Sequence, residues 1–252
     1  MIMEADDKLL ISKTEDLFKL CDKYASPRFS DFLDGAQLAV IRDNVVFPCD
    51  FKVHFFGGFD DAEKQIMGVF PEWSDITLCD FPITCIKVEG GFSRKLTHRD
   101  YLGTIMSLGI TSQKLGDIVV YDSYAYVFLH SDIAEYVKDN LHKIGNQGVK
   151  VTVFDNLDEI TVQREYKTFS AVCAAPRLDA IVGAAANISR AQSAALINAG
   201  KVKLNHRENY KTADTVKEGD LLSIRGYGRF LVHSFDGETR KMRMHITFKQ
   251  YV

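Results

Sequence analysis

Six consecutive segments between residues 80 and 155 alternate between strand-like and helix-like patterns of apolar residues. Strands repeat every two residues, whereas helices place apolar residues three and four positions apart. The patterns predict strands at 81–91, 116–122, 124–130 and 148–155 and helices at 97–110 and 131–145. The second helix extends this far because Leu141 and Ile144 continue its apolar stripe. The resulting β-α-β-β-α-β order predicts a split βαβ domain over residues 79–158, the ferredoxin-like plan that RNA-recognition domains also use.

Residues 1–78 predict a separate N-terminal α/β domain. Residues 7–25 have the apolar spacing of a helix, and residues 28–43 predict a second helix. Residues 51–70 predict a strand, a glycine turn and a third helix that Asp60 caps, with Glu63 completing a capping box. We interpret the double glycine as an ordinary turn rather than a phosphate loop, because no Walker-type Lys-Ser/Thr follows it.

The predicted fold class is therefore α+β with three small units, the third being a C-terminal domain over residues 174–252. Residues 156–176 predict a connecting strand that leads to Pro176. From Pro176 onward the chain has thirteen Lys and Arg against seven Asp and Glu, while the rest has eighteen against twenty-seven. A basic C-terminal third on an acidic body is typical of a module that binds a polyanion.

The composition indicates a cytoplasmic protein without a structural metal or disulfide framework. No apolar run is long enough to cross a bilayer, and the first residues lack a signal-peptide core. The five cysteines form no C-x-x-C pair, which favours reduced thiols. We expect no catalytic residue, no metal and no small-molecule cofactor.

Three aromatic residues alternate along the predicted strand 124–130. Tyr124, Tyr126 and Phe128 share one face, since successive side chains of a strand point to opposite sides. Two interpretations are open: the rings form a stacking platform for bases, or they pack against the N-terminal domain.

Four basic residues, Arg94, Lys95, His98 and Arg99, lie at the start of the predicted helix 97–110. Thr97 is its expected N-cap, with Asp100 as the partner in a capping box. Free N–H groups and cations at a helix start suit a phosphate oxygen, although a solvated loop is an equal alternative. His-Arg-Asp is not interpreted as a kinase motif, because no glycine-rich loop or DFG accompanies it.

Residues 177–207 combine dense alanine with recurrent arginine and lysine. They predict two short helices, the second capped by Ser189 and ended by Gly200, followed by a strand. We expect Ala191, Ala194 and Ala195 to bring the helices close together. We also expect four cations to share one face: Arg177, Arg190, Lys201 and Lys203.

This stretch resembles the RNA-binding domain named after ribosomal protein S4, in its αL motif. The similarity rests on Arg177-Leu178-Asp179, Ser189-Arg190, Leu196-Ile197, Gly200, Val202 and Asn205 and on the closing strand "TVKEGDLLSI". Two departures concern Ala194, where a further cation is usual, and His206-Arg207, which stands where glycine is usual. Further motifs, "FGGFDDAE", "THRDYLG", "GDLLSIRGYGRF" and "GETRKMR", are similar to those of the YlmH family of bacterial proteins.

The resemblance implies a C-terminal S4-type domain that binds structured RNA. It also implies that the protein associates with the large ribosomal subunit, near peptidyl-tRNA, and contacts ribosomal RNA and tRNA there. It also implies a part in the rescue of stalled ribosomes by C-terminal tailing, and a link to cell-division genes. We expect the RNA-binding side chains to be Arg177, Arg190, Lys201, Lys203, Asn205, Arg207, Arg225, Tyr227, Arg229, Arg94, Lys95, His98 and Arg99.

Two alternatives compete with a non-catalytic RNA-binding protein. The first is an RNA-modifying enzyme, such as a pseudouridine synthase, that uses the S4-type domain for targeting; residues 1–170 contain no G-x-G-x-x-G cofactor loop. The second is a DNA-binding regulator with a helix-turn-helix, although the alanine-rich second helix lacks a basic recognition face.

Overall fold

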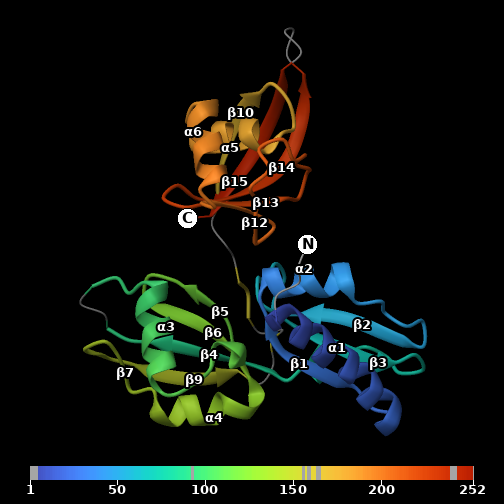
Figure 1. Ribbon diagram of the computed structural model, residues 1–252. Helices are drawn as coiled ribbons and strands as arrows, with labels where there is room; N and C mark the ends of the chain where they lie inside the picture. Colours follow the sequence, from blue (N-terminus) through green and yellow to red (C-terminus); the bar gives the residue numbers. More distant parts are fainter. Residues whose placement is uncertain are drawn as a thin grey trace. The chain divides into compact units, whose positions relative to one another are not determined.

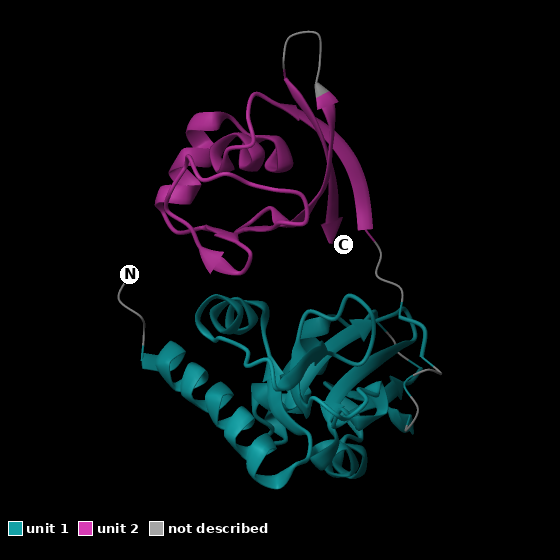
Figure 2. Cartoon of the chain, turned by 90° about the vertical axis from the view of Figure 1, so that its right-hand side faces the viewer, with its two compact units in different colours: residues 1–162 teal, residues 163–252 magenta. Residues whose placement is uncertain are grey.

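The computed structural model describes residues 5–91, 94–154, 157, 160–162, 166–238 and 243–251. It divides into two compact units, residues 1–162 and 163–252, which Figure 2 colours separately. Both units combine helices with antiparallel sheets, so the α+β class is confirmed. Among the residues described, no helix is long and apolar enough to cross a membrane, and no group of His, Cys, Asp and Glu could hold a metal ion.

The first half of unit 1 is a three-stranded sheet with two helices (Figure 1). Its elements are α1 (Ala5–Tyr24), β1 (Arg28–Leu33), α2 (Gly35–Asn44), β2 (Phe51–Phe56) and β3 (Gln65–Pro71), and the strand order is β1-β3-β2. Phe18 and Cys21 of α1 and Ile41 of α2 pack with Met67 and Val69 of the central strand. The helix predicted at 7–25 is thus confirmed.

The single helix predicted over residues 28–43 is wrong. Residues 28–33 form β1, because they pair with β3 rather than continue the helical turn. The helix α2 starts only after Asp34, whose carboxylate accepts the backbone N–H of Gln37 at 2.9 Å. The side chain of Gln37 accepts the N–H of Asp34 in return, so a capping box separates strand from helix.

The helix predicted after the double glycine is also wrong. Residues 65–71 form β3, the central strand, which pairs with β1 on one side and β2 on the other. Asp60 and Glu63 lie in the turn that joins β2 to β3 and cap no helix. A run of apolar residues that is buried from both sides does not show the two-residue period of a half-exposed strand.

The second half of unit 1 confirms the predicted β-α-β-β-α-β order. Its elements are β4 (Ile83–Glu89), α3 (His98–Ser107), β5 (Leu115–Val120), β6 (Tyr124–His130), α4 (Ser131–Asn140) and β9 (Lys150–Phe154). Every pair in the sheet β5-β6-β4-β9 is antiparallel. The two helices cover one face, where Tyr101, Ile105 and Val137 pack on the strands. Short 3-10 turns lie at Leu78–Asp80 and Ser112–Lys114.

The helix predicted over 131–145 is five residues too long. It ends at Asn140, and Ile144 belongs to a small hairpin of β7 (Lys143–Ile144) and β8 (Gln147–Gly148). Leu141 and Ile144 are buried in the same core as Val137, so the apolar stripe continues in space after the helix stops.

The uncovered face of the four-stranded sheet is partly closed by the first half of unit 1. Phe128 of β6 and Cys85 of β4 are fully buried against Phe32 and Phe70. Asp117 of β5 also accepts the backbone N–H of Glu63 at 2.7 Å. These contacts join the two sheets of unit 1 through a shared core.

Unit 2 places two helices on one face of a six-stranded sheet of order β10-β15-β14-β13-β11-β12. The elements are β10 (Tyr166–Cys173), α5 (Leu178–Ala186), α6 (Arg190–Asn198), β11 (Val202–Leu204), β12 (Arg207–Glu208), β13 (Leu221–Ile224), β14 (Gly228–Glu238) and β15 (Met244–Tyr251). The segment expected to be a connecting strand is β10, an edge strand that pairs with β15 along its whole length.

The two helices of unit 2 confirm the predicted elements but not their predicted packing. Ser189 caps α6 in a capping box with Gln192, and Gly200 follows the helix at φ 66°. The expected alanine contact is wrong, because Ala191 and Ala195 are exposed and Ser193 and Ile197 form the buried face. The close approach occurs at Gly183, where an added Cβ would lie 3.0 Å from the Ser193 hydroxyl.

A candidate RNA-binding surface on unit 2

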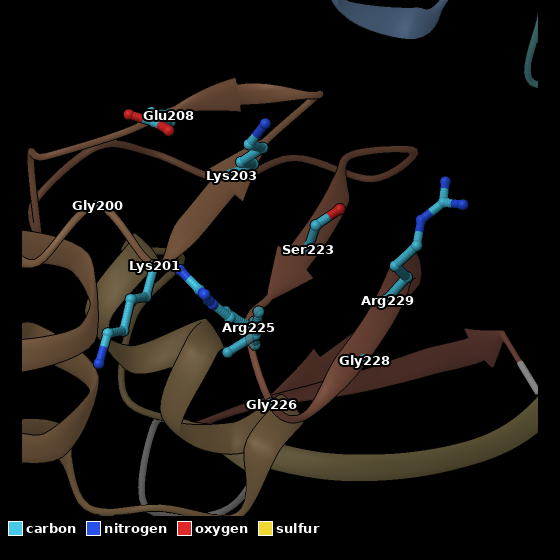
Figure 3. A pocket seen from close by; sticks show the side chains of 10 residues that line it. Gly200, Lys201, Lys203, Glu208, Ser223, Arg225, Gly226, Gly228 and Arg229 are labelled. Atoms are coloured by element: carbon cyan, nitrogen blue, oxygen red, sulfur yellow. The ribbon is translucent and has the colours of Figure 1, made fainter. Parts of the chain in front are cut away.

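Four predicted cations surround one pocket of about 410 Å³ on unit 2 (Figure 3). Lys201 precedes β11, Lys203 lies within it, Arg225 follows β13 and Arg229 lies near the start of β14. The remaining lining residues are Gly200, Glu208, Ser223, Ile224, Gly226 and Gly228. Chain segments far apart in the sequence therefore place four positive charges around a single opening.

The strand register aligns part of this rim in one row. Lys203 pairs with Glu208 on one side and Ser223 on the other, and Ser223 pairs with Arg229. Figure 3 shows the side chains of Lys203, Ser223 and Arg229 projecting to the same side of the sheet. The neighbouring residue Ile224 is buried with the core on the opposite face. Since side chains alternate along a strand, the polar row lies on the face away from the two helices.

A tight turn positions the far end of the pocket. Gly226 and Gly228 have φ values of 90° and 114°, a region that only glycine adopts readily. Between them, Tyr227 is 41% exposed at the tip of the hairpin. The backbone N–H of Arg225 donates to the carbonyl of Lys201 at 2.9 Å, which joins the two strand ends at the pocket.

Arg229 is held by an aromatic ring. Its guanidinium lies 4.7 Å from the ring centroid of Tyr251, which lies on the adjacent strand β15. A cation above an aromatic face is attracted to it and loses conformational freedom. On the opposite side of the pocket, Glu208 accepts the hydroxyl of Tyr210 at 2.7 Å.

Arg177 and Arg190 do not line this pocket. They start the two helices, as predicted, and both hydrogen-bond to Asp179, with Arg190 Nε 3.0 Å from Asp179 Oδ2. The Asp179 carboxylate is buried. Burial alone would raise the pKa of Asp179, but the hydrogen bonds from the two arginines outweigh it and leave this pKa below its usual value. The pair therefore holds the two helix starts together.

Asn205 lies in the turn between β11 and β12, and Arg207 is the first residue of β12. The amide of Asn205 donates to Asp220 at 2.8 Å, and its oxygen accepts the N–H of Leu221 at 2.9 Å. Asn205 has φ 49°, a left-handed conformation that asparagine tolerates better than most residues. Its side chain is therefore engaged within the unit, and Arg207 is half-buried outside the pocket lining.

The predicted cations at residues 94–99 lie in unit 1. Thr97 precedes α3, and Asp100 accepts its backbone N–H at 2.7 Å, which confirms the expected capping pair. Arg94 forms an ion pair with Asp100 at 2.7 Å, and Lys95 with Asp122 at 2.8 Å. His98 and Arg99 are exposed on the first turn. Nearby carboxylates thus offset part of the positive charge of this loop.

Sequence reasoning missed two features of these surfaces. Asp179 was noted only as a motif residue, although a carboxylate two residues after Arg177 could have suggested an ion pair. Tyr251 was missed because only the strand pairing brings it beside Arg229.

The three aromatic residues of β6, expected either to stack bases or to pack against the N-terminal domain, differ in their burial. Phe128 is fully buried in the core shared with the N-terminal sheet. Tyr124 and Tyr126 are half-buried and form a ring cluster with Tyr121.

Comparisons with known proteins find matches to both the sequence and the fold. Residues 77–158 match the family described as "Putative RNA-binding domain in YlmH". The chain is 29% identical over 252 residues to the ribosome-associated protein quality control protein P2 of Bacillus subtilis, covering 97% of this chain and 95% of that protein. The fold matches the cell division protein ylmH from Streptococcus pneumoniae at TM-score 0.52 and 18% identity, over 61% of this chain and 94% of that one. Residues 77–158 thus match the RNA-binding domain described for YlmH, and the chain is similar over nearly its whole length to the Bacillus subtilis protein.

Proposed function

We propose that this chain is a non-catalytic RNA-binding protein that associates with the ribosome in the cytoplasm. The observation that carries the proposal is the ring of four cations around one pocket on unit 2. The name of the Bacillus subtilis relative and the description of the family that matches residues 77–158 support the same class of function. The proposal includes three domains, at residues 1–78, 79–158 and 174–252, the last of them an S4-type domain.

The pocket has the chemistry of a phosphate-binding surface. Contacts between cations and backbone phosphates contribute much of the affinity of proteins for RNA. Lys201, Lys203 and Arg225 are exposed, and Gly226 and Gly228 leave room for the RNA backbone to approach closely. A-form RNA presents a wide minor groove with 2′-hydroxyls, which suits recognition by shape on a compact surface.

The finer part of the proposal concerns the ribosomal partner. We propose that the protein contacts the ribosomal RNA of the large subunit and the tRNA bound to it, during rescue of stalled ribosomes. A link to cell division is part of the same proposal, supported by the name of the Streptococcus pneumoniae protein of similar fold.

The test is co-sedimentation of the full chain with ribosomal subunits in sucrose gradients. The triple variant Lys201→Gln, Lys203→Gln, Arg225→Gln removes three exposed pocket cations. We expect it to lose co-sedimentation with the large subunit, and its log-affinity for structured RNA to fall less steeply with log salt, by about two units of slope.

A matched control removes the same charge from unit 2 outside the pocket. Lys167, Lys211 and Lys217 are exposed and do not line it, so their triple Gln variant should co-sediment like the unmodified protein. Equal loss in both triple variants would show an effect of net charge only, and retention in both would exclude the pocket as the contact.

The non-catalytic part of the proposal has its own test. Total RNA is incubated with the protein, and new modifications are mapped by sequencing and mass spectrometry. We expect none, and a modified nucleotide whose formation depends on the protein would instead support the RNA-modifying enzyme.

A further inference from the structure

We propose that Tyr121, Tyr124 and Tyr126 form a second RNA site, at which unpaired bases of single-stranded RNA stack. This tyrosine platform lies in unit 1, on a different sheet from the cationic pocket of unit 2. It goes beyond the proposed function, because it concerns another part of the chain and another form of RNA.

The three rings form one compact group at one end of the four-stranded sheet. Tyr121 stacks on Tyr124 with ring centroids 4.7 Å apart and an interplanar angle of 24°. Tyr126 meets both rings edge-on, at 5.3 Å from Tyr124 and 6.0 Å from Tyr121. Tyr126 also contacts Phe154 of the edge strand β9 edge-on at 6.0 Å, so the ring contacts extend across the sheet from β6 to β9.

The platform lies where the covering of the sheet face ends. Phe128, two residues further along β6, is fully buried beneath Phe59 and residues of the N-terminal sheet. Tyr124 and Tyr126 share its face of the strand but keep part of their surface exposed. Along β6, Phe128 is thus core, Tyr126 packs against the edge of that core, and Tyr124 presents a partly exposed ring beyond it.

Basic groups stand beside the rings. The Lys87 ammonium lies 4.8 Å from the ring centroid of Tyr124 and pairs with Glu89 at 2.6 Å. Lys150, on the neighbouring strand β9 and opposite Glu89, is exposed. A strand of RNA whose bases lie on the tyrosines would bring its phosphates within reach of these lysines.

The chemistry of the site favours single strands over duplexes. In a duplex the faces of the bases are stacked on one another, so flat side chains can bind only bases that are splayed out. Aromatic rings accept any base, because every base has a π-face, and RNA-recognition sheets use aromatic residues in this way. The matched description of residues 77–158 names an RNA-binding domain but no ligand surface, and the tyrosine platform supplies one.

The experiment measures binding of a short fluorescein-labelled oligoadenylate to the full chain by anisotropy, at one salt concentration. The double variant Tyr121→Leu, Tyr124→Leu keeps apolar bulk but removes the rings, and we expect it to lose about tenfold in affinity. The matched double variant to Phe keeps both rings and should bind within about twofold of the unmodified chain. Circular dichroism melts of all three proteins establish that they are folded.

Equal affinity of the leucine variant and the unmodified chain would overturn the proposal. So would equal loss in the leucine and phenylalanine variants, because stacking does not need the hydroxyl. A measurement on the unmodified chain is independent of variant folding: oligonucleotides containing 4-thiouridine should crosslink to the peptide with Tyr121 and Tyr124. Crosslinks confined to unit 2 would contradict the platform.

The triple variant of the cationic pocket in unit 2 distinguishes experimentally between the two proposed RNA sites. It should retain most of its oligoadenylate binding while losing co-sedimentation with the large subunit. If the unmodified chain co-sediments with ribosomes but does not bind oligoadenylate, the tyrosine platform is wrong and the proposed function stands.

Discussion

The two units of this chain use the same layered architecture in different ways. In each, two helices cover one face of an antiparallel sheet. In unit 1 the other face is half covered by a second sheet and ends in tyrosines, whereas in unit 2 it carries Lys203, Ser223 and Arg229. The comparison teaches that two units with the same layered architecture can differ in the side chains that their uncovered sheet faces present.

The largest expected effect tests the covered half of the sheet in unit 1. Phe128→Ala should lower the free energy of unfolding of unit 1 by about 3–5 kcal/mol, because it empties a fully buried site. Urea unfolding followed by the fluorescence of Trp73, the single tryptophan of the chain and a residue of unit 1, measures it. A loss below about 1 kcal/mol, typical of a surface site, would remove the contrast between the two halves of this face.

An intermediate effect tests how unit 2 holds its two helix starts. Asp179→Asn should lower the free energy of unfolding by about 1–3 kcal/mol near neutral pH, because it weakens charged hydrogen bonds to Arg177 and Arg190. The folded pKa of Asp179 lies below its unfolded value, so the stabilisation is complete above the unfolded pKa and is lost as the pH falls through the folded pKa.

The measurement for Asp179 is the difference in urea midpoint between the two proteins from pH 7 to acid. We expect the difference to shrink below about pH 4, where the unfolded carboxyl becomes protonated. Lys95→Ala, which removes an exposed ion pair in unit 1, is the control and should change stability by less than about 1 kcal/mol. A pH-independent difference would mean that the Asp179 carboxylate contributes through packing rather than charge.

The smallest expected effect compares one glycine from a helix of each unit. Gly103 of α3 has open space around an added Cβ, whereas at Gly183 of α5 that atom would lie 3.0 Å from Ser193 and 3.1 Å from the carbonyl of Ile188. Gly103→Ala should stabilise by up to about 1 kcal/mol through helix propensity, and Gly183→Ala should be neutral or destabilising by about 1 kcal/mol. Thermal melts of both variants check this difference; equal stabilisation by both would show that α5 and α6 can separate without loss.

Local patterns predicted most of the elements. The β-α-β-β-α-β order of residues 79–158 followed from periodicity, and the caps at Thr97 and Ser189 followed from local residue types, with Asp100 as the expected partner of Thr97. The errors fell where distant strands decide. Residues 65–71 form a strand because β1 and β2 pair with them from both sides. No pattern within that segment indicates that these two strands will pair with it.

The candidate sites show the same division. Residue types alone indicated a polyanion-binding C-terminal third, because charge is a property of composition. They did not indicate that Arg177 and Arg190 meet at Asp179 while Lys201, Lys203, Arg225 and Arg229 surround a pocket. That grouping depends on the register of β11, β13 and β14, whose pairing residues lie far apart in the chain.

The sequence by itself determined most of the helices and strands, where two helices are capped and which third of the chain is basic. The tertiary structure decided that Ala191 is exposed, that Phe128 is core and that Tyr124 remains partly open. The physical reason is the distance along the chain over which each interaction acts. Helix capping and the apolar period of a helix or strand depend on residues a few positions apart, whereas burial depends on surfaces that only the folded chain brings together.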